Sequence, residues 1–363
     1  MIKKEFQDAA MTMPTEPIGS IPRPPELINA VANGDHADPI LDPLYDIAIR
    51  DTIERFEATG SPVITDGEQR KYHNFWTYCV HGLANTTPDG FTIPFKAGHK
   101  RRMPQLTSGP FRYRIYADRY LVAAMRYTHT PVKQAVISPS ALSLMYPAKE
   151  IPGYSREEFI DDLLREHEME VRRCLDRGAH KVQIDFTEGR LAIKLDPTGK
   201  LLNSFIDLNN LALSRFTPEE LMRIGVHTCP GADRDSTHSA DIDYAELLPS
   251  LLQLKAGNFY LSLAGEHDPV RTLKIIRAHI KPNQRIFIGV TNPIDPRIEN
   301  VEEIRNRIVE AARYIPMDQL GTTDDCGFSP FCDDTSTSRD TAFEKIQARV
   351  IGTVLASKLI MGS

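Results

Sequence analysis

Short apolar runs alternate with longer amphipathic stretches along most of the chain. The runs are rich in Val, Ile, Leu and Phe and end in small or polar residues, as the buried strands of a parallel sheet do. Eight runs follow this pattern and predict eight strands. They are Pro17–Ser20, Pro62–Asp66, Val132–Ser138, Lys181–Asp185, Ile224–Thr228, Phe259–Ala264, Ile286–Thr291 and Leu320–Asp324.

The amphipathic stretches between the runs are typical of helices that bury one face. A strand followed by a helix, repeated eight times, is the pattern of a (β/α)8 barrel. We therefore predict an α/β fold, a single (β/α)8 TIM barrel domain over residues 1–363. The predicted helical segments are Leu44–Thr59, parts of Tyr113–Tyr127, Ser155–Arg177, Pro218–Arg223, Tyr244–Leu254, Pro269–His279, Val301–Tyr314 and Thr341–Leu359.

Local signals refine this plan at several points. Ser155 followed three residues later by Glu158 has the spacing of a capping box and predicts a helix start. The segment Asn85–Arg112 is rich in Pro, Gly and Thr and fits no helix, so we expect a long insertion after the second strand, covering the barrel mouth. Residues 1–14 are expected to form a peripheral tail, and Asp233–Asp243 a polar loop.

Composition narrows the class of protein. The chain has 363 residues, of which 41% are hydrophobic and 25% charged, which is typical of a globular enzyme with a large core. A formal charge of −6 provides no broad basic surface, which excludes extended binding to nucleic acid or to an anionic membrane. No apolar run resembles a secretory signal or a membrane span, so a cytoplasmic enzyme is expected. A homo-oligomer is compatible with this composition.

Five cysteines form an odd set without the spacing of a disulfide framework. Reduced thiols, some of them bound to a metal, fit this pattern better. Cys79, Cys174 and Cys332 are interpreted as structural, which leaves Cys229 and Cys326 as candidates for chemistry.

The sharpest signal lies at the ends of two predicted strands. His227 and Cys229 stand two positions apart, so an extended chain directs both side chains to the same side. Cys326 follows the eighth run and would reach the same ion across the barrel mouth. Zinc binds such nitrogen and sulfur ligands tetrahedrally, and a catalytic zinc keeps one position open. The competing interpretation is two buried cysteines and a hydrogen-bonded histidine.

Carboxylates form a second group of candidates. Glu68, Asp185 and Glu188 lie at strand ends or just beyond them, where they would hold the ammonium group of an amino acid or transfer protons. The alternative is that each pairs with a basic residue or caps the following helix. Gly19 and Ser20 offer donors suited to a carboxylate, or form a plain turn.

Aromatic residues gather soon after Glu68, where they would stack on a ligand or pack as a lid. We expect His238 and His267 at the surface or beside the metal ligands rather than among them. The aromatic cluster consists of Tyr72, His73, Phe75, Trp76 and Tyr78.

Five short motifs occur in order at these positions. They are Pro17-Ile18-Gly19-Ser20 with Arg23 nearby, Thr65-Asp66-Gly67-Glu68, Val182-Gln183-Ile184-Asp185, His227-Thr228-Cys229 and Asp325-Cys326-Gly327-Phe328. With them the chain resembles the cobalamin-independent methionine synthase family, and in particular its catalytic C-terminal barrel, from about residue 15 to about residue 355.

The resemblance implies a zinc site of His227, Cys229, Cys326 and an acidic residue. It also implies a thiol substrate that binds as thiolate and attacks an alkyl donor. By the same comparison, Glu68 and Asp185 would hold the amino group of homocysteine, and the Ile18–Ser20 turn its carboxylate.

This sequence departs from the family pattern at three points. The zinc-binding glutamate of the family aligns with Ala264, and Glu266 follows two residues later. Because a strand has a period of two, we predict Glu266 as the fourth zinc ligand. Ile294 replaces a histidine after the seventh strand, and the family's N-terminal barrel is absent, so methyltetrahydrofolate is not assigned as the donor.

The leading hypothesis is a zinc-dependent methyltransferase or alkyltransferase that acts on homocysteine or a related small-molecule thiol. An epoxide-opening transferase, similar to the epoxyalkane:coenzyme M transferases, is one alternative. A zinc-dependent lyase or hydrolase with Asp185 or Glu188 as base is another, and a barrel without turnover is the third.

Overall fold

Six parallel strands form the central sheet of the computed structural model, which describes residues 13–33, 41–71, 74–88, 90–95, 100–231 and 235–362. The strands pair in the order in which they occur along the chain. They are β5 (Gln134–Ile137), β6 (Val182–Asp185), β7 (Ile224–Thr228), β8 (Asn258–Leu261), β9 (Arg285–Thr291) and β10 (Leu320–Asp324).

The first two predicted strands complete the ring but form no regular ladder. Thr15 makes a single parallel bridge to Thr322 of β10, and Ile64 makes one to Val132 beside β5. The two segments meet each other where the Ile21 N–H donates to the Gly67 carbonyl at 3.1 Å. Each segment begins with a proline, Pro17 or Pro62, and because proline has no N–H it cannot donate to a ladder. All eight predicted runs therefore lie side by side in chain order.

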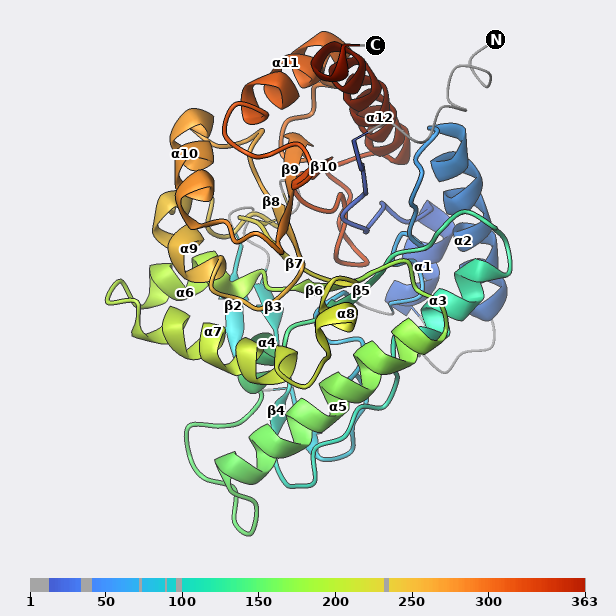
Figure 1. The fold of residues 1–363 in the computed structure, drawn as a ribbon. Helices are drawn as coiled ribbons and strands as arrows, with labels where there is room; N and C mark the ends of the chain where they lie inside the picture. The colour runs from blue at the N-terminus through green and yellow to red at the C-terminus, as the bar shows by residue number, and fades with distance from the viewer. Residues whose placement is uncertain are drawn as a thin grey trace.

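Helices surround the strands on the outside (Figure 1). Every predicted helical segment contains a helix, and the Ser155–Glu158 capping box is present. Helices α1, α4, α6 and α7 were not predicted; α4 is a single short turn, and α7 contains several asparagines, which are weak helix formers. The helices are α1 (Pro25–Asn33), α2 (Leu41–Ala58), α3 (Asp118–Met125), α4 (Pro139–Ser143), α5 (Arg156–Asp176), α6 (Glu188–Leu195), α7 (Lys200–Leu213), α8 (Pro218–Leu221), α9 (Tyr244–Leu251), α10 (Pro269–His279), α11 (Val301–Ala311) and α12 (Arg339–Met361).

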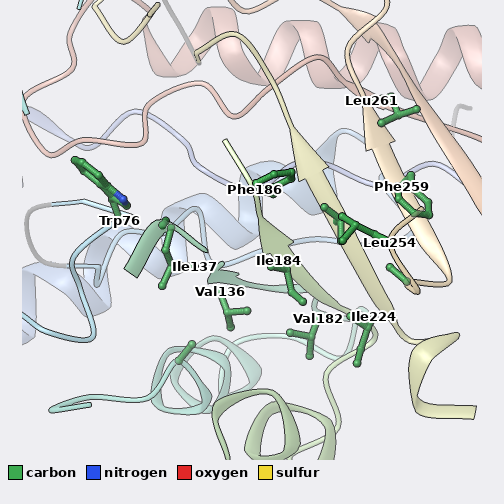
Figure 2. Packing of buried hydrophobic residues seen from close by; sticks show 14 of the residues in the cluster. Trp76, Val136, Ile137, Val182, Ile184, Phe186, Ile224, Leu254, Phe259 and Leu261 are labelled. Carbon is green, nitrogen blue, oxygen red and sulfur yellow. The ribbon is translucent and has the colours of Figure 1, made fainter. Parts of the chain in front are cut away.

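Successive side chains of each strand face two different environments, the surrounding helices and the interior of the ring. Val136, Val182 and Ile224 lie together in the apolar layer on the helical side of the sheet, as Figure 2 shows. Gln183 and Asp185 alternate with the apolar residues of β6 and therefore face the interior of the ring. The hydrophobic pattern thus fixes which side chains reach the interior.

The predicted insertion Asn85–Arg112 folds as two small antiparallel pairs. Strand β1 (Thr86–Thr87) pairs with β4 (Gln105–Leu106), and β2 (Thr92–Pro94) pairs with β3 (Lys100–Arg102). Within its described residues the insertion contains no helix, as expected from its composition.

Among the described helices, none combines the length and apolar character that a membrane crossing requires.

A cluster of charges fills the interior near the amino ends of the strands, and we call it the basal ion cluster. Its carboxylate is Glu16, which accepts from Lys181 Nζ at 2.5 Å and from the Tyr260 hydroxyl at 2.6 Å, with Lys133 Nζ at 3.9 Å. Burial alone raises the pKa of Glu16, but hydrogen bonding to His180 and the two lysines hold it far below its ordinary value. This cluster closes the ring beneath the site described next.

Candidate functional site

A cavity opens at the carboxyl ends of the strands, with about 660 Å³ of empty volume including its mouth. In a barrel this end carries the reactive residues, because the loops that follow the strands converge there. We call this space the site cavity. Its chemically active lining residues are Ser20, Glu68, Asp185, Glu188, His227, Cys229, His238 and Cys326.

The three predicted zinc ligands converge in this cavity. One ligand atom from each of His227, Cys229 and Cys326 lies within 4.8 Å of the others, and Cys326 Sγ is 3.5 Å from His227 Nε2. The sequence predicted reduced thiols, whereas the structure joins Cys229 and Cys326 as a disulfide with a Cα–Cα distance of 5.8 Å. That separation brings both sulfurs to one point, which suits a shared metal ion as well.

His227 is prepared for metal binding by its surroundings. Its Nδ1 lies 3.3 Å from the Tyr260 carbonyl, which can only accept a hydrogen bond, so the proton is on Nδ1 and the lone pair of Nε2 faces Cys326. Burial lowers the pKa of His227 to about 3, which keeps the imidazole neutral. Neutral imidazole is the form that coordinates zinc, so these three residues fit the ion.

Glu266, predicted from the strand period as the fourth ligand, does not lie in the group formed by these three residues. Strand β8 ends at Leu261, and the Asp325 carboxylate accepts from the N–H groups of Leu263, Ala264 and Gly265. These bonds bend the chain into a turn, so the period of two no longer applies at Glu266.

The side chain of Glu266 is instead bound to Arg190. It lines a neighbouring cavity of about 1250 Å³ that meets the site cavity at Gly231 and Cys326. Ile294 lines the same neighbouring cavity and brings no titratable group to it.

Glu68 and Asp185 lie together on one wall of the site cavity. Glu68 Oε1 is 3.4 Å from Nζ of the fully buried Lys71, and Asp185 accepts from Gln183 Nε2 at 2.8 Å. Burial raises the pKa of Glu68 to about 7 and that of Asp185 to about 6, although Lys71 opposes both shifts. Two buried carboxylates with one lysine form a site that attracts a further cation.

The turn at Ile18–Ser20 adjoins this wall. Ile18 and Ser20 line the cavity, and a Cβ added at Gly19 between them would lie 3.3 Å from Glu68 Oε1. Glu68 itself has a left-handed backbone, with φ of 58°, after Gly67 at 68°. Glycine at 19 therefore allows the close approach of Glu68 to the turn.

Glu188 occupies a separate part of the cavity, at the first residue of α6. It accepts hydrogen bonds from the hydroxyls of Ser138 (2.6 Å) and Ser140. Burial raises the pKa of Glu188 to about 7 against the lowering effect of these two bonds.

The outer part of the cavity is apolar. From the predicted aromatic cluster, Phe75 and Trp76 line it, whereas Tyr78 donates to Glu170 at 2.8 Å and packs against Lys71. Tyr72 and His73 lie outside the described residues. Sequence reasoning missed four further wall residues, which come from the insertion, α6 and the segment after β10: Ile93, Phe95, Leu191 and Phe331.

The two unassigned histidines have different environments. His238 is buried in the cavity wall beside Phe95, with ring centroids 5.7 Å apart, and burial lowers its pKa to about 4. His267 is exposed and lines the neighbouring cavity. Both agree with the expectation that neither belongs to the ligand set.

Sequence reasoning missed Lys71 and Ser140. The only signal for Lys71 was its position three residues after Glu68.

Comparison with known proteins places this geometry in a family. The model of the cobalamin-independent synthase catalytic domain matches residues 13–339. A methionine synthase of Sulfurisphaera tokodaii is 23% identical over 351 residues, which cover 95% of this chain and 93% of that protein. The 5-methyltetrahydropteroyltriglutamate–homocysteine methyltransferase of Nitratidesulfovibrio vulgaris Hildenborough is 23% identical over 323 residues, or 87% of this chain and 39% of that one.

Solved structures support the same fold. A B12-independent methionine synthase from Shewanella sp. W3-18-1, in complex with selenomethionine, superposes with a TM-score of 0.71 at 18% identity, covering 97% of this chain and all of that one. A putative B12-independent methionine synthase from Listeria monocytogenes gives 0.66 at 19% identity, with 97% and 99% covered. The prediction of an α/β barrel is therefore confirmed.

Proposed function

The chain belongs to the cobalamin-independent synthase family through its catalytic domain, and from that premise we propose a zinc-dependent methyltransferase that acts on the thiol of homocysteine. The observation that carries the proposal is the convergence of His227, Cys229 and Cys326 within 4.8 Å. Once the disulfide between Cys229 and Cys326 is reduced, two thiolates and a neutral imidazole at the reactive end of a barrel form a ligand set that suits zinc.

The proposed metal site uses three protein ligands. When bound, zinc supplies the charge that lowers the pKa of a coordinated thiol, so that a thiolate nucleophile exists near neutral pH. With Glu266 held by Arg190, His227, Cys229 and Cys326 would hold the ion and would leave room for the substrate sulfur to bind it. Because the ligands must be thiolates, the reducing cytoplasm is the compartment that suits Cys229 and Cys326.

Glu68 and Asp185 are proposed to bind the ammonium group of homocysteine. An incoming ammonium would stabilise both carboxylates in their ionised form, which burial disfavours in the free protein. Ser20 and the Ile18 backbone, which line the same cavity, would receive the substrate carboxylate. These contacts would orient the sulfur toward His227, since the two groups share one cavity.

The alkyl donor would enter from the apolar side of the cavity. Phe75, Trp76, Ile93 and Phe95 would exclude water from the sulfur, which favours transfer to the thiol over hydrolysis of the donor. The lining of the site cavity, within the described residues, contains no lysine or arginine. A negatively charged donor portion beside the sulfur is therefore a poor fit.

Zinc K-edge absorption tests the central proposal. The zinc-loaded protein is measured alone and after addition of homocysteine. We expect two sulfur ligands without the substrate and one additional sulfur with it. An unchanged first coordination shell, together with activity that does not depend on a thiol, would instead favour the hydrolase interpretation.

A further inference from the structure

The carboxyl group of Glu188 has two oxygens in very different environments. Its side chain lies in the site cavity with Asp185, His227 and Cys326, and the residue is 5% exposed. Oε1 accepts two hydroxyl hydrogen bonds, whereas buried Oε2 has no hydrogen-bond partner among the described residues. A buried oxygen without a partner costs stability, so its retention in a reactive cavity needs a reason.

The hydrogen bonds around Oε1 have a defined direction. Ser138 Oγ accepts from the Ala141 N–H at 3.1 Å, and Ser140 Oγ accepts from Asn209 Nδ2 at 2.8 Å. Each hydroxyl thus has its own hydrogen left to donate. Ser138 donates to Glu188 Oε1, and the Ser140 hydroxyl has Glu188 Oε1 as its nearer acceptor, with Ser138 Oγ at 3.3 Å. A carboxyl proton would clash with these donors at Oε1, so a protonated Glu188 carries its proton on Oε2.

Oε2 is therefore a hydrogen-bond donor with nothing among the described residues to receive it. Glu68 also has an unpartnered Oε2, but its Oε1 lies beside Lys71, whereas Asp185 accepts from Gln183. Asp185 is the charged neighbour of Glu188, and their repulsion favours protonation of the pair. Neutral His238 completes the titratable lining of the cavity outside the ligand cluster.

We propose that Glu188 is the general acid that protonates the leaving atom of the alkyl donor, a role that rests on the proposed alkyl transfer. The substrate thiol gives up its proton on binding, and that proton resides on Glu188 Oε2. The sulfur lone pair forms the new S–C bond, the bond between carbon and leaving atom breaks with its electron pair, and the leaving atom takes the Oε2 proton. The sum is thiol plus donor giving thioether plus protonated leaving group.

The donor class follows from this assignment. A general acid is useful when the leaving atom is a nitrogen or oxygen that departs as a poor anion, and it is unnecessary for halide or thioether leaving groups. Ser140 and Asn209 are positioning residues, because they act only by fixing the proton on Oε2. The natural donor is thus expected to carry its alkyl group on nitrogen or oxygen.

Two electrophiles separate this role from the alkyl transfer itself. The zinc-loaded protein with homocysteine is treated with iodomethane, whose leaving group needs no proton, and with epoxypropane, whose alkoxide needs one. For Glu188→Gln we expect the epoxide-to-iodomethane rate ratio to fall about 100-fold relative to wild type, the usual contribution of a general acid. Glu157→Gln, an exposed carboxylate at the start of α5, is the matched control and should keep the wild-type ratio.

Each outcome has a separate meaning. An unchanged ratio in Glu188→Gln with both alkylations intact would overturn the acid role and leave the proposed function standing. Failure of the wild-type protein to alkylate homocysteine with either probe, above the rate in buffer, would overturn the proposed function itself.

The pH profile provides the second readout. The epoxide reaction of the wild type should lose rate as pH rises through about 7, where Glu188 deprotonates, and Glu188→Gln should lack that limb. Ser140→Ala removes one bond that lowers the pKa of Glu188, so its limb should move to higher pH. A limb that stays in place in both variants would contradict the proposal.

Discussion

Buried carboxylates at the two ends of the barrel interior have opposite environments. In the basal ion cluster Glu16 is surrounded by Lys181, Lys133 and Tyr260, and neither of its oxygens lacks a partner. In the site cavity, Glu68 Oε2 and Glu188 Oε2 are buried without any hydrogen bond from the described residues. The pKa of Glu16 is accordingly lowered, whereas burial raises the pKa values of Glu68 and Glu188 to about 7.

This difference separates a structural role from a functional one. A satisfied ion cluster stabilises the fold and offers nothing to a ligand. Unsatisfied carboxylates cost stability until a substrate supplies the missing partners, and for that reason they gather at functional sites. The comparison predicts that substitutions at the two ends should fail in different assays.

The largest effect is expected at the metal ligands. Cys326→Ser should reduce bound zinc from about one ion per chain to near zero, because a catalytic zinc site has only three protein ligands to lose. Methyl transfer to homocysteine should fall at least about 1000-fold, since the thiolate is no longer available near neutral pH. Elemental analysis and product formation measure the two quantities. Cys332→Ser is the control, and full activity in metal-free protein would refute the assignment.

A substitution in the basal ion cluster should lower the stability of the protein without changing its activity. Glu16→Gln leaves two buried lysines without their carboxylate and should lower the free energy of unfolding by about 3–5 kcal/mol. Urea denaturation measures this loss, with exposed Glu157→Gln as control. The folded fraction should keep its zinc and its turnover. A stable Glu16→Gln protein with impaired turnover would break the comparison between the two ends.

A smaller effect, on substrate affinity, is expected for the ammonium site. Asp185→Asn should raise the KM for homocysteine about 30- to 150-fold, because a hydrogen bond to a charged group contributes roughly 2–3 kcal/mol. Steady-state kinetics should show no such change for 4-mercaptobutanoate, which lacks the amino group. An equal penalty for both thiols would place Asp185 outside the ammonium site.

The smallest expected effect is on how the Tm changes with pH. Because burial raises the pKa of Glu188 to about 7 from an ordinary value of 4.5, its protonated form favours folding at low pH. That contribution is full below about 4.5 and is lost as pH rises through about 7. Between pH 5 and 8 the Tm of metal-free wild type should therefore fall by about 2–4 °C relative to Glu188→Gln. Parallel Tm curves from thermal unfolding would mean that Glu188 is ionised in the folded protein throughout.

The sequence by itself determined the strands, their order and the three residues that meet at their ends. Strand period decides which side chains face the interior, and a parallel barrel brings the carboxyl ends of all strands to one rim. The positions of His227, Cys229 and Cys326 relative to the strand ends therefore indicated that they could meet, and the family resemblance singled out the zinc site among the alternatives. The motifs around Glu68 and Asp185 were identified for the same reason.

Only the tertiary structure decided where the carboxylates of Glu266 and Glu188 lie and what they contact. Glu266 is diverted because Asp325, about 60 residues away in the chain, bends the end of β8 into a turn, and because Arg190 binds its carboxylate. The free oxygen of Glu188 depends on hydroxyls 48 and 50 residues earlier. The local sequence pattern does not identify such distant partners, because a hydrogen bond depends on the positions of its two groups in space and not on their separation along the chain.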